Sequence, residues 1–224
     1  MRQETTFLFD LDGTLVDSVY QHVLAWQEAL EEEGISLSVW RIHRKIGMSG
    51  GLFTNQLLRE TGLTLDDERN DRLRRLHAQA YQRLAHRIHP LPGAVELLKT
   101  LDEYGLRWAI ATSGRMETAA QNLIALGLDP ENTPVITRDL VKYAKPDPDL
   151  FLAAAERLGV RIETAIVVGD SIWDMLAAQR CRALGVGLLC GGYGSDELER
   201  AGAYRVFEDP ADLLKHLDEV GGRV

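Results

Sequence analysis

The sequence is poor in three things: cysteine, long apolar runs and positive charge. Its 224 residues include two cysteines, Cys181 and Cys190, whose spacing matches neither a disulfide framework nor a metal-binding motif. It has no run of about 18 apolar residues, the length that spans a bilayer. No signal-peptide pattern precedes the first apolar run. We therefore expect a cytoplasmic protein that has no membrane partner.

Basic residues are fewer than acidic ones. The sequence has 25 lysines and arginines and 34 aspartates and glutamates, which gives a net charge of -9. This balance argues against a nucleic-acid partner, since nucleic-acid binding needs a basic surface. The densest basic stretch, residues 69–75 (RNDRLRR), is interpreted as the solvated face of a helix. The length suits one core domain with a modest insert.

Short apolar runs alternate with segments in which apolar residues have helical spacing, such as Val95-Leu98-Leu101. This alternation predicts an α/β fold in which a parallel sheet carries helices on both faces. The runs interpreted as buried strands are Thr6–Phe9, Trp108–Ala111, Pro134–Ile136, Ala165–Val168 and Val186–Leu189, with Tyr204–Phe207 as a sixth strand at an edge.

Residues 17–89 break this alternation. They contain helical patterns, such as the apolar stripe Val19-Val23-Trp26-Leu30, and glycines divide them into about four helices. We predict a catalytic core formed by residues 1–16 and 90–224, with an all-helical cap at residues 17–89. An insert at this place lies over the carboxyl ends of the strands, where ligands bind in open α/β sheets. We interpret the insert as a lid, and an insertion without a function is the alternative.

Acidic side chains follow two of the predicted strands at the point where each one ends. Asp10 and Asp12 follow the first strand, while Asp170 and Asp174 follow Ala165–Val168 and are one helical turn apart. In a parallel sheet these residues converge on one rim. Carboxylate oxygens suit Mg²⁺, so a metal site is predicted. Two of the acids in these stretches, Asp17 and Asp174, could instead be ordinary helix caps.

Two further strand ends carry groups that could bind phosphate. Thr112 and Ser113 offer donors at a strand-to-helix turn, although any helix N-cap needs the same groups. Lys145 precedes Pro146-Asp147-Pro148, and we predict that Pro148 begins a helix capped by Asp147. Such a helix would fix Lys145 just before its start, where the ammonium group can face the carboxylates.

These residues together favour phosphoryl transfer. A carboxylate such as Asp10 can attack phosphorus and form an acyl phosphate, provided that Mg²⁺ and a lysine offset the negative charge. The leaving oxygen then needs a proton, which a second acid supplies before it deprotonates water. Asp12 can take that role.

The motifs resemble those of the haloacid dehalogenase-like superfamily of phosphohydrolases. Residues 10–18 (DLDGTLVDS) are similar to its first motif, and Thr112, Lys145 and the stretch from Gly169 to Asp174 resemble the other three, in the same order. The resemblance implies a Rossmann-like, doubly wound parallel sheet core with an inserted helical cap. It further implies that Thr112 and Lys145 bind the phosphoryl group.

The same resemblance assigns roles to the acids. Asp10 would be phosphorylated, and Asp12 would be the acid/base. Mg²⁺ would be held by Asp10, the backbone carbonyl of Asp12 and Asp170, with Asp174 nearby. The dehalogenases of the family lack the second acid of the first motif, so the presence of Asp12 argues against dehalogenation.

A phosphomutase branch of the family also carries this type of cap. His22 resembles a histidine of that branch and of related sugar-phosphate phosphatases, although it could simply be a solvent-facing hinge residue. The branch tends to have an arginine in the cap loop for a second phosphate, whereas residues 47–51 (GMSGG) have none. Arg115 could contact substrate or simply begin a helix.

We therefore expect a Mg²⁺-dependent phosphoric monoester hydrolase that acts on a small phosphorylated metabolite, either phosphoglycolate-like or a sugar phosphate. A sugar phosphomutase of the β-phosphoglucomutase type is the alternative, and a non-catalytic interaction module is a third hypothesis. The sequence leaves open whether the protein is a monomer or a homodimer.

Overall fold

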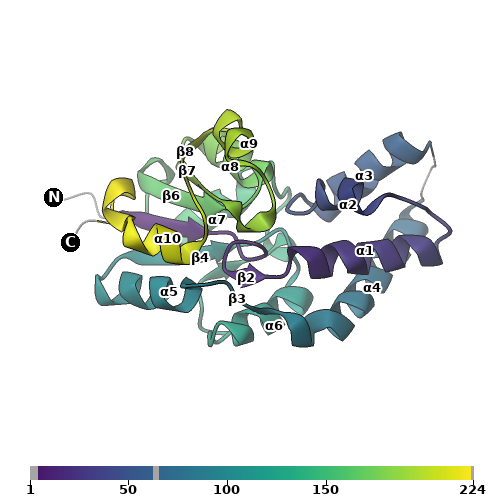
Figure 1. Cartoon of the computed structure of the whole chain (residues 1–224), viewed down its shortest axis with the longest axis horizontal. Coiled ribbons are helices and arrows are strands. Elements are labelled where there is room, and N and C mark those ends of the chain that lie inside the picture. The colour runs from purple at the N-terminus through teal and green to yellow at the C-terminus, as the bar shows by residue number, and fades with distance from the viewer. Residues whose placement is uncertain (1–4, 63–65, 223–224) are drawn as a thin grey trace.

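The computed structural model describes residues 5–62 and 66–222 (Figure 1). A six-stranded parallel sheet has the order β5-β4-β1-β6-β7-β8. Its strands are β1 (Thr6–Phe9), β4 (Arg107–Ala111), β5 (Val135–Ile136), β6 (Ala165–Gly169), β7 (Leu184–Leu188) and β8 (Ala203–Phe207). All six predicted strands are confirmed, with ends shifted by at most two residues. The chain starts in the middle of the sheet, so both halves of the sheet diverge from β1.

The alternating side chains of β1 explain why helices cover both faces of the sheet. Phe7 and Phe9 point to one face, where they belong to an apolar cluster with α5 (Ala94–Glu103) and α6 (Met116–Ala125). Leu8 points to the other face and packs with α7 (Asp149–Leu158) and α8 (Ile172–Cys181). The remaining helices of the core are α9 (Ser195–Arg200) and α10 (Pro210–Lys215), with short 3₁₀ turns at Arg138–Leu140, Ile162–Thr164, Leu189–Gly191 and Leu217–Val220.

The segment after β1 forms a separate helical layer, seen at the right of Figure 1. It consists of α1 (Val19–Glu32), α2 (Val39–His43), α3 (Gly50–Thr61) and α4 (Asp67–Leu84), followed by a 3₁₀ turn at Ala85–Arg87. The predicted stripe on α1 is buried and packs with Phe53 and Leu73 in an apolar cluster of its own. This independent cluster supports the proposed cap, whose boundaries stay a prediction.

A short antiparallel ribbon, which the sequence did not predict, joins this layer to the core. Its strands are β2 (Val16–Asp17) and β3 (His89–Pro90), in which Val16 pairs with Pro90 and Asp17 with His89. Two residues are too few to show a strand period, which explains why the pattern missed them. Asp17 lies in this ribbon, and Ser18 occupies the N-cap position of α1.

The predicted start of the helix after Lys145 is wrong. Pro148 is the N-cap residue of α7, which begins at Asp149, and Asp147 does not cap it. The Asp147 carboxylate instead accepts a hydrogen bond from Arg180 Nη1 at 3.1 Å. The Asp147 side chain is therefore engaged with α8 and does not cap α7.

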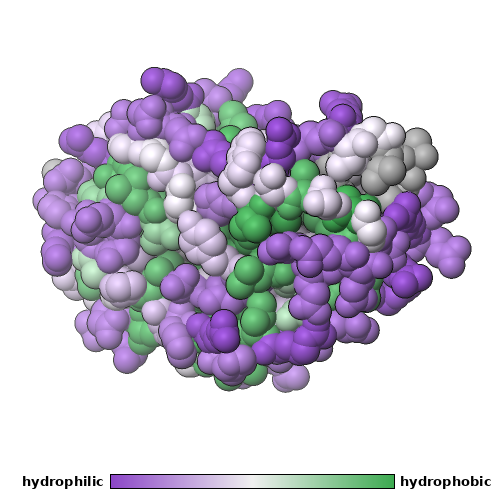
Figure 2. Space-filling model, turned by 45° about the vertical axis from the view of Figure 1, so that its right-hand side comes forward, coloured by the Kyte–Doolittle hydropathy of each residue, from purple (hydrophilic) through white to green (hydrophobic). Residues whose placement is uncertain are grey.

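Figure 2 shows a surface of mostly hydrophilic side chains, with apolar side chains gathered near the centre of this face. Exposed apolar side chains on the helical layer include Leu24 of α1 and Trp40 of α2. Within the described parts of the chain, no helix is both long enough and apolar enough to cross a membrane.

Candidate active site

The predicted site residues come from neighbouring strands. Asp10 follows β1, Thr112 follows β4 and Asp170 follows β6, and these three strands are adjacent in the sheet. Gly13 makes the turn after β1 possible. It has a φ of +83°, and a Cβ atom there would lie 2.6 Å from the Asp170 carboxylate. A glycine is thus required for the two acidic strand ends to approach each other.

Lys145 lies at the centre of a buried carboxylate cluster. Its Nζ is 2.5 Å from Asp10 Oδ1 and 2.8 Å from Asp174 Oδ1, and its side chain is fully buried. Burial alone would lower the pKa of Lys145, but the charges of Asp10 and Asp174 outweigh burial and raise it. The ammonium group therefore stays charged, as the sequence-based hypothesis requires.

Burial raises the pKa of two carboxyl groups of the cluster, those of Asp10 and Asp170. Burial, partly offset by Lys145 and reinforced by Asp174, raises the pKa of Asp10 to about 7. Burial and then the charges of Asp174 and Asp10 raise the pKa of Asp170 well above its usual value, although its Oδ1 accepts a hydrogen bond from Thr14. Burial, together with repulsion between the acids, therefore outweighs the attraction of Lys145.

The same acids form a group that could hold a metal ion. Oxygen atoms of Asp10, Asp170 and Asp174 all lie within 4.8 Å of one another, and the three residues are buried. An all-carboxylate donor set with excess negative charge fits a hard divalent cation. Asp174 has a second task, because its Oδ2 accepts hydrogen bonds from the backbone N–H and the hydroxyl group of Ser171 and so caps α8.

The side chain of Asp12 points away from this cluster into a polar network. Its Oδ1 accepts hydrogen bonds from Ser18 Oγ at 2.6 Å and from Asn122 Nδ2 at 2.7 Å, and His22 Nε2 lies 3.2 Å away. Its Oδ2 is 3.5 Å from Thr112 Oγ1. Burial would raise the pKa of Asp12, but the charge and hydrogen bond of His22, together with Ser18, lower it.

His22 is a buried contact of Asp12, so the alternative of a solvent-facing hinge residue is wrong. Its ring stacks on Tyr81 at 3.9 Å between centroids, and its Nδ1 lies 3.1 Å from His77 Nε2. Tyr81 and His77 are on α4, and sequence reasoning missed both of them along with Asn122. Their spacing of four residues on α4 was the available signal, because it places both on the same helix face.

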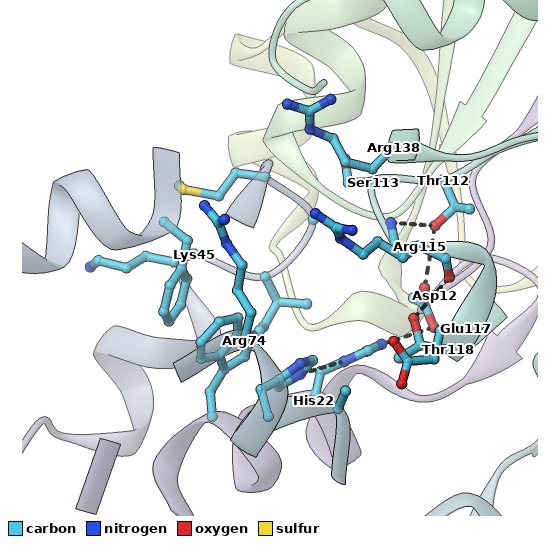
Figure 3. A pocket seen from close by; sticks show the side chains of 18 of the residues that line it. Asp12, His22, Lys45, Arg74, Thr112, Ser113, Arg115, Glu117, Thr118 and Arg138 are labelled. Atoms are coloured by element: carbon cyan, nitrogen blue, oxygen red, sulfur yellow. Dashed lines mark hydrogen bonds and ion pairs between the residues drawn. The ribbon is translucent and has the colours of Figure 1, made fainter. Parts of the chain in front are cut away.

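A cavity of about 640 Å³ lies between the strand ends and the helical layer (Figure 3). Asp10, Asp12, Thr112 and Ser113 line its core side. Ser113 Oγ is buried, and it has no hydrogen-bond partner among the described residues. This hydroxyl group is therefore available to a ligand in the cavity, as a phosphate-binding role would require.

Arginines from separate elements also line the cavity. Figure 3 shows the side chains of Arg74 from α4 and of Arg115 extending into it, whereas the guanidinium group of Arg138 points away from Asp12 and donates to the Val141 carbonyl at 2.6 Å. Arg72 and Arg75 are exposed, in agreement with the interpretation of residues 69–75 as a solvated face, but Arg75 and the half-buried Arg74 also line the cavity. Arg115 is at the N-cap position of α6, and its Nη1 lies 3.3 Å from Asp139 Oδ1.

Comparisons with known proteins agree with this geometry. The crystal structure of a hydrolase from Pseudomonas syringae is 64% identical, with a TM-score of 0.96, and the match covers 97% of this chain and 99% of that one. Phosphoglycolate phosphatase of Caulobacter vibrioides is 31% identical over 94% of this chain and 89% of its own length. Hexitol phosphatase A of Escherichia coli is 34% identical over 80% of this chain and 82% of its own.

A family model described as haloacid dehalogenase-like hydrolase matches residues 4–182, which span all four motifs discussed above. The predicted family and the predicted α/β fold are both confirmed. The chain belongs to the haloacid dehalogenase-like hydrolase family.

Proposed function

We propose that the protein hydrolyses a small phosphomonoester in the presence of Mg²⁺, with Asp10 as the nucleophile. The enzyme class itself, phosphoric monoester hydrolase, follows from a hydrolase family whose relatives are named phosphatases. The observation that carries the proposal is the fully buried Lys145 ammonium group between Asp10 and Asp174. A cation in that position makes it possible for a carboxylate to approach an anionic phosphate.

In the proposed reaction, an Asp10 oxygen forms a bond to phosphorus while the bond from phosphorus to the ester oxygen breaks. Asp12 gives its proton to that oxygen, which leaves as an alcohol. Asp12 then removes a proton from water, whose oxygen attacks phosphorus and releases Asp10 and inorganic phosphate. Thr112, Ser113 and Lys145 hold the phosphoryl oxygens throughout.

Asp10 and Asp170 are the residues proposed to hold Mg²⁺, together with the backbone carbonyl of Asp12. Both oxygens of Asp174 already have partners in Lys145 and Ser171. Asp174 therefore acts mainly by holding Lys145 in place. When bound, the cation supplies positive charge that screens the phosphoryl group from Asp10.

The arginines of the cavity favour one class of substrate. Arg74 and Arg115 line the cavity beyond the phosphate-binding groups, so basic side chains can meet the part of the substrate remote from phosphorus. Asp71 and Glu117 line the same cavity, and Asp71 pairs with Arg74. A carboxylate or second phosphate there would be bound more strongly than a neutral hydroxyl group. A phosphoglycolate-like substrate, or a sugar phosphate that carries an acidic group, therefore fits better than a neutral sugar phosphate.

The same arginines keep the sugar phosphomutase alternative open, because they could hold the second phosphate of a bisphosphate. Incubation with a hexose 1-phosphate separates the two functions. Release of inorganic phosphate supports the phosphatase, and accumulation of the 6-phosphate isomer supports the mutase.

The four helices α1–α4 are proposed to act as a lid over the site. His22 and Tyr81 from this layer meet Asp12 and Asn122 from the core. Closure of such a layer would exclude bulk water from the phosphoenzyme until the leaving group has departed.

A panel of phosphorylated metabolites, assayed for phosphate release with Mg²⁺ and with EDTA, tests the proposal. We expect turnover of at least one small phosphomonoester, higher kcat/KM for those with a second acidic group, and no turnover after chelation. Turnover that persists in EDTA, or that survives in the Asp10→Asn variant, would contradict the proposed function.

A further inference from the structure

Asn122 is a buried polar residue next to apolar core residues of α6. Asn122 is on α6, next to Leu123 and one turn after Ala119, which are both core residues. It is 1% exposed. Because burying an amide is costly unless its polar atoms are paired, the reason for an asparagine at this position must be found in its contacts.

The Asn122 amide connects Asp12 to the helical layer. Its Nδ2 donates to Asp12 Oδ1 at 2.7 Å, and this atom must be the nitrogen because an ionised carboxylate can only accept. The Tyr81 hydroxyl group lies 2.8 Å from Nδ2 and 3.1 Å from Oδ1 of Asn122. Both ends of the amide are therefore fixed, one by the acid and the other by the phenol of α4.

The two oxygens of Asp12 have different surroundings as a result. Oδ1 is surrounded by donors from Ser18, Asn122 and His22, and the Tyr81 hydroxyl group also lies 3.4 Å from it. Among the described residues, Oδ2 has one long hydrogen-bond contact, to Thr112 Oγ1 at 3.5 Å, and Asp12 lines the cavity. Because donors already occupy Oδ1, Oδ2 is the oxygen that can carry a proton to a bound ester.

We propose that Asn122 is a positioning residue for the acid/base of this enzyme, and that Tyr81 holds Asn122 in place. The inference rests on the proposed function, in which Asp12 protonates the leaving oxygen. Without the Asn122 amide, the carboxyl group of Asp12 loses one of the donors that fix its rotation about the Cβ–Cγ bond, and Oδ2 points less consistently at the ester oxygen.

The loss of rate in a variant distinguishes a positioning role from a structural one. If Asn122 positions Asp12, the loss depends on the leaving group, and if Asn122 is only structural, it does not. A good leaving group such as p-nitrophenolate departs with little help from an acid, whereas an alkoxide needs a proton in the transition state. Misplacing Asp12 should therefore slow the cleavage of alkyl phosphates more than the cleavage of p-nitrophenyl phosphate. Partial loss of folded enzyme would lower both rates equally.

The test compares kcat/KM of the full-length protein with Mg²⁺ for a good alkyl phosphate substrate from the panel and for p-nitrophenyl phosphate. We expect Asn122→Leu to lower the alkyl value by about 10²-fold or more and the aryl value by about 10-fold or less, within the range of general acid catalysis. Tyr81→Phe, which keeps the ring against His22, should show the same selectivity at a smaller size.

Leu123→Ala is the matched control, because it removes a buried side chain from the same helix without touching Asp12. It should lower the melting temperature and leave the ratio of the two kcat/KM values unchanged. If Asn122→Leu and Tyr81→Phe also leave that ratio unchanged, Asn122 is structural and the inference is wrong. The wild-type enzyme tests the function separately, since its turnover and the effect of Asp10→Asn do not depend on Asn122.

Discussion

Asp10 and Asp12 are separated by one residue, yet their carboxyl groups lie in opposite environments. Asp10 points into the acidic cluster with Asp170 and Asp174, where burial raises its pKa to about 7. Asp12 points into a network of donors in which His22 and Ser18 lower its pKa despite burial. The difference shows that partners brought by other elements, and not spacing in the motif, set the charge of each acid.

The contrast also shows what ligands must do for the reaction to proceed. A divalent cation beside Asp10 would favour its ionised form, which a nucleophile needs. The negative charge of a bound phosphoryl group would favour the protonated form of Asp12, which a general acid needs. In this account the cation favours the ionised form of Asp10, and the phosphoryl group favours the protonated form of Asp12.

The largest expected effect comes from removing each acid in turn. Asp10→Asn should abolish turnover because no nucleophile remains, while circular dichroism shows an intact fold. Asp12→Asn should lower kcat by about 10²–10⁴-fold with little change in KM, since it removes proton transfer rather than binding. Equal losses in both variants, measured by steady-state kinetics, would mean that the two environments do not correspond to two roles.

Removal of Lys145 should be the next largest effect. Lys145→Met leaves buried carboxylates without their cation, and loss of one partner of a buried ion pair costs about 3–5 kcal/mol in the free energy of unfolding. Lys45 is a matched control, because it is also buried but pairs with the more exposed Glu60. Lys45→Met should cost about 1 kcal/mol or less. Similar urea denaturation midpoints for the two variants would contradict the central role of Lys145.

Metal binding should depend on pH in a defined direction. Since the metal-free pKa of Asp10 is about 7, protons compete with the cation below that pH, and Mg²⁺ affinity should fall as the pH drops from 8 to 5.5. Conversely, a raised carboxyl pKa means that the metal-free folded state binds more protons than the unfolded chain. Its stability should therefore fall as the pH rises from about 4 to about 7.

Calorimetric titration with Mg²⁺ and urea unfolding in EDTA measure these two trends. The Asp10→Asn variant should show a weaker pH dependence in both experiments. A Mg²⁺ affinity that is constant across this pH range would show that Asp10 is ionised without the metal.

The smallest expected effect is a shift in the pH dependence of kcat/KM when a partner of Asp12 is replaced. His22 lowers the pKa of Asp12, so His22→Asn should raise it. Because Asp12 must be protonated to release the leaving group, the basic limb of the profile of kcat/KM should move to higher pH. Gln27→Ala, a change at a half-buried position of the same helix, should leave the profile in place. A basic limb that moves to lower pH in the His22 variant would contradict the assigned direction.

Sequence patterns could predict the strands and the acids that follow them, because a buried strand that ends in carboxylates leaves a strong local signal. They could not predict Asn122, since one amide within an apolar helix face has no periodic signature. Nor could they predict that Arg74 lines the cavity, because a run of basic residues does not reveal which side of a helix faces a cavity. Asp147 was misjudged because its partner, Arg180, is distant in the sequence.

Rapid acid quenching during turnover, followed by mass spectrometry of the peptides, tests the central claim most directly. The account predicts a phosphoryl group on Asp10 in the wild-type enzyme, and on the same residue at higher occupancy in Asp12→Asn when an aryl phosphate is supplied. A phosphoryl group on any other residue, or steady phosphate release with Asp10 always unmodified, would contradict it.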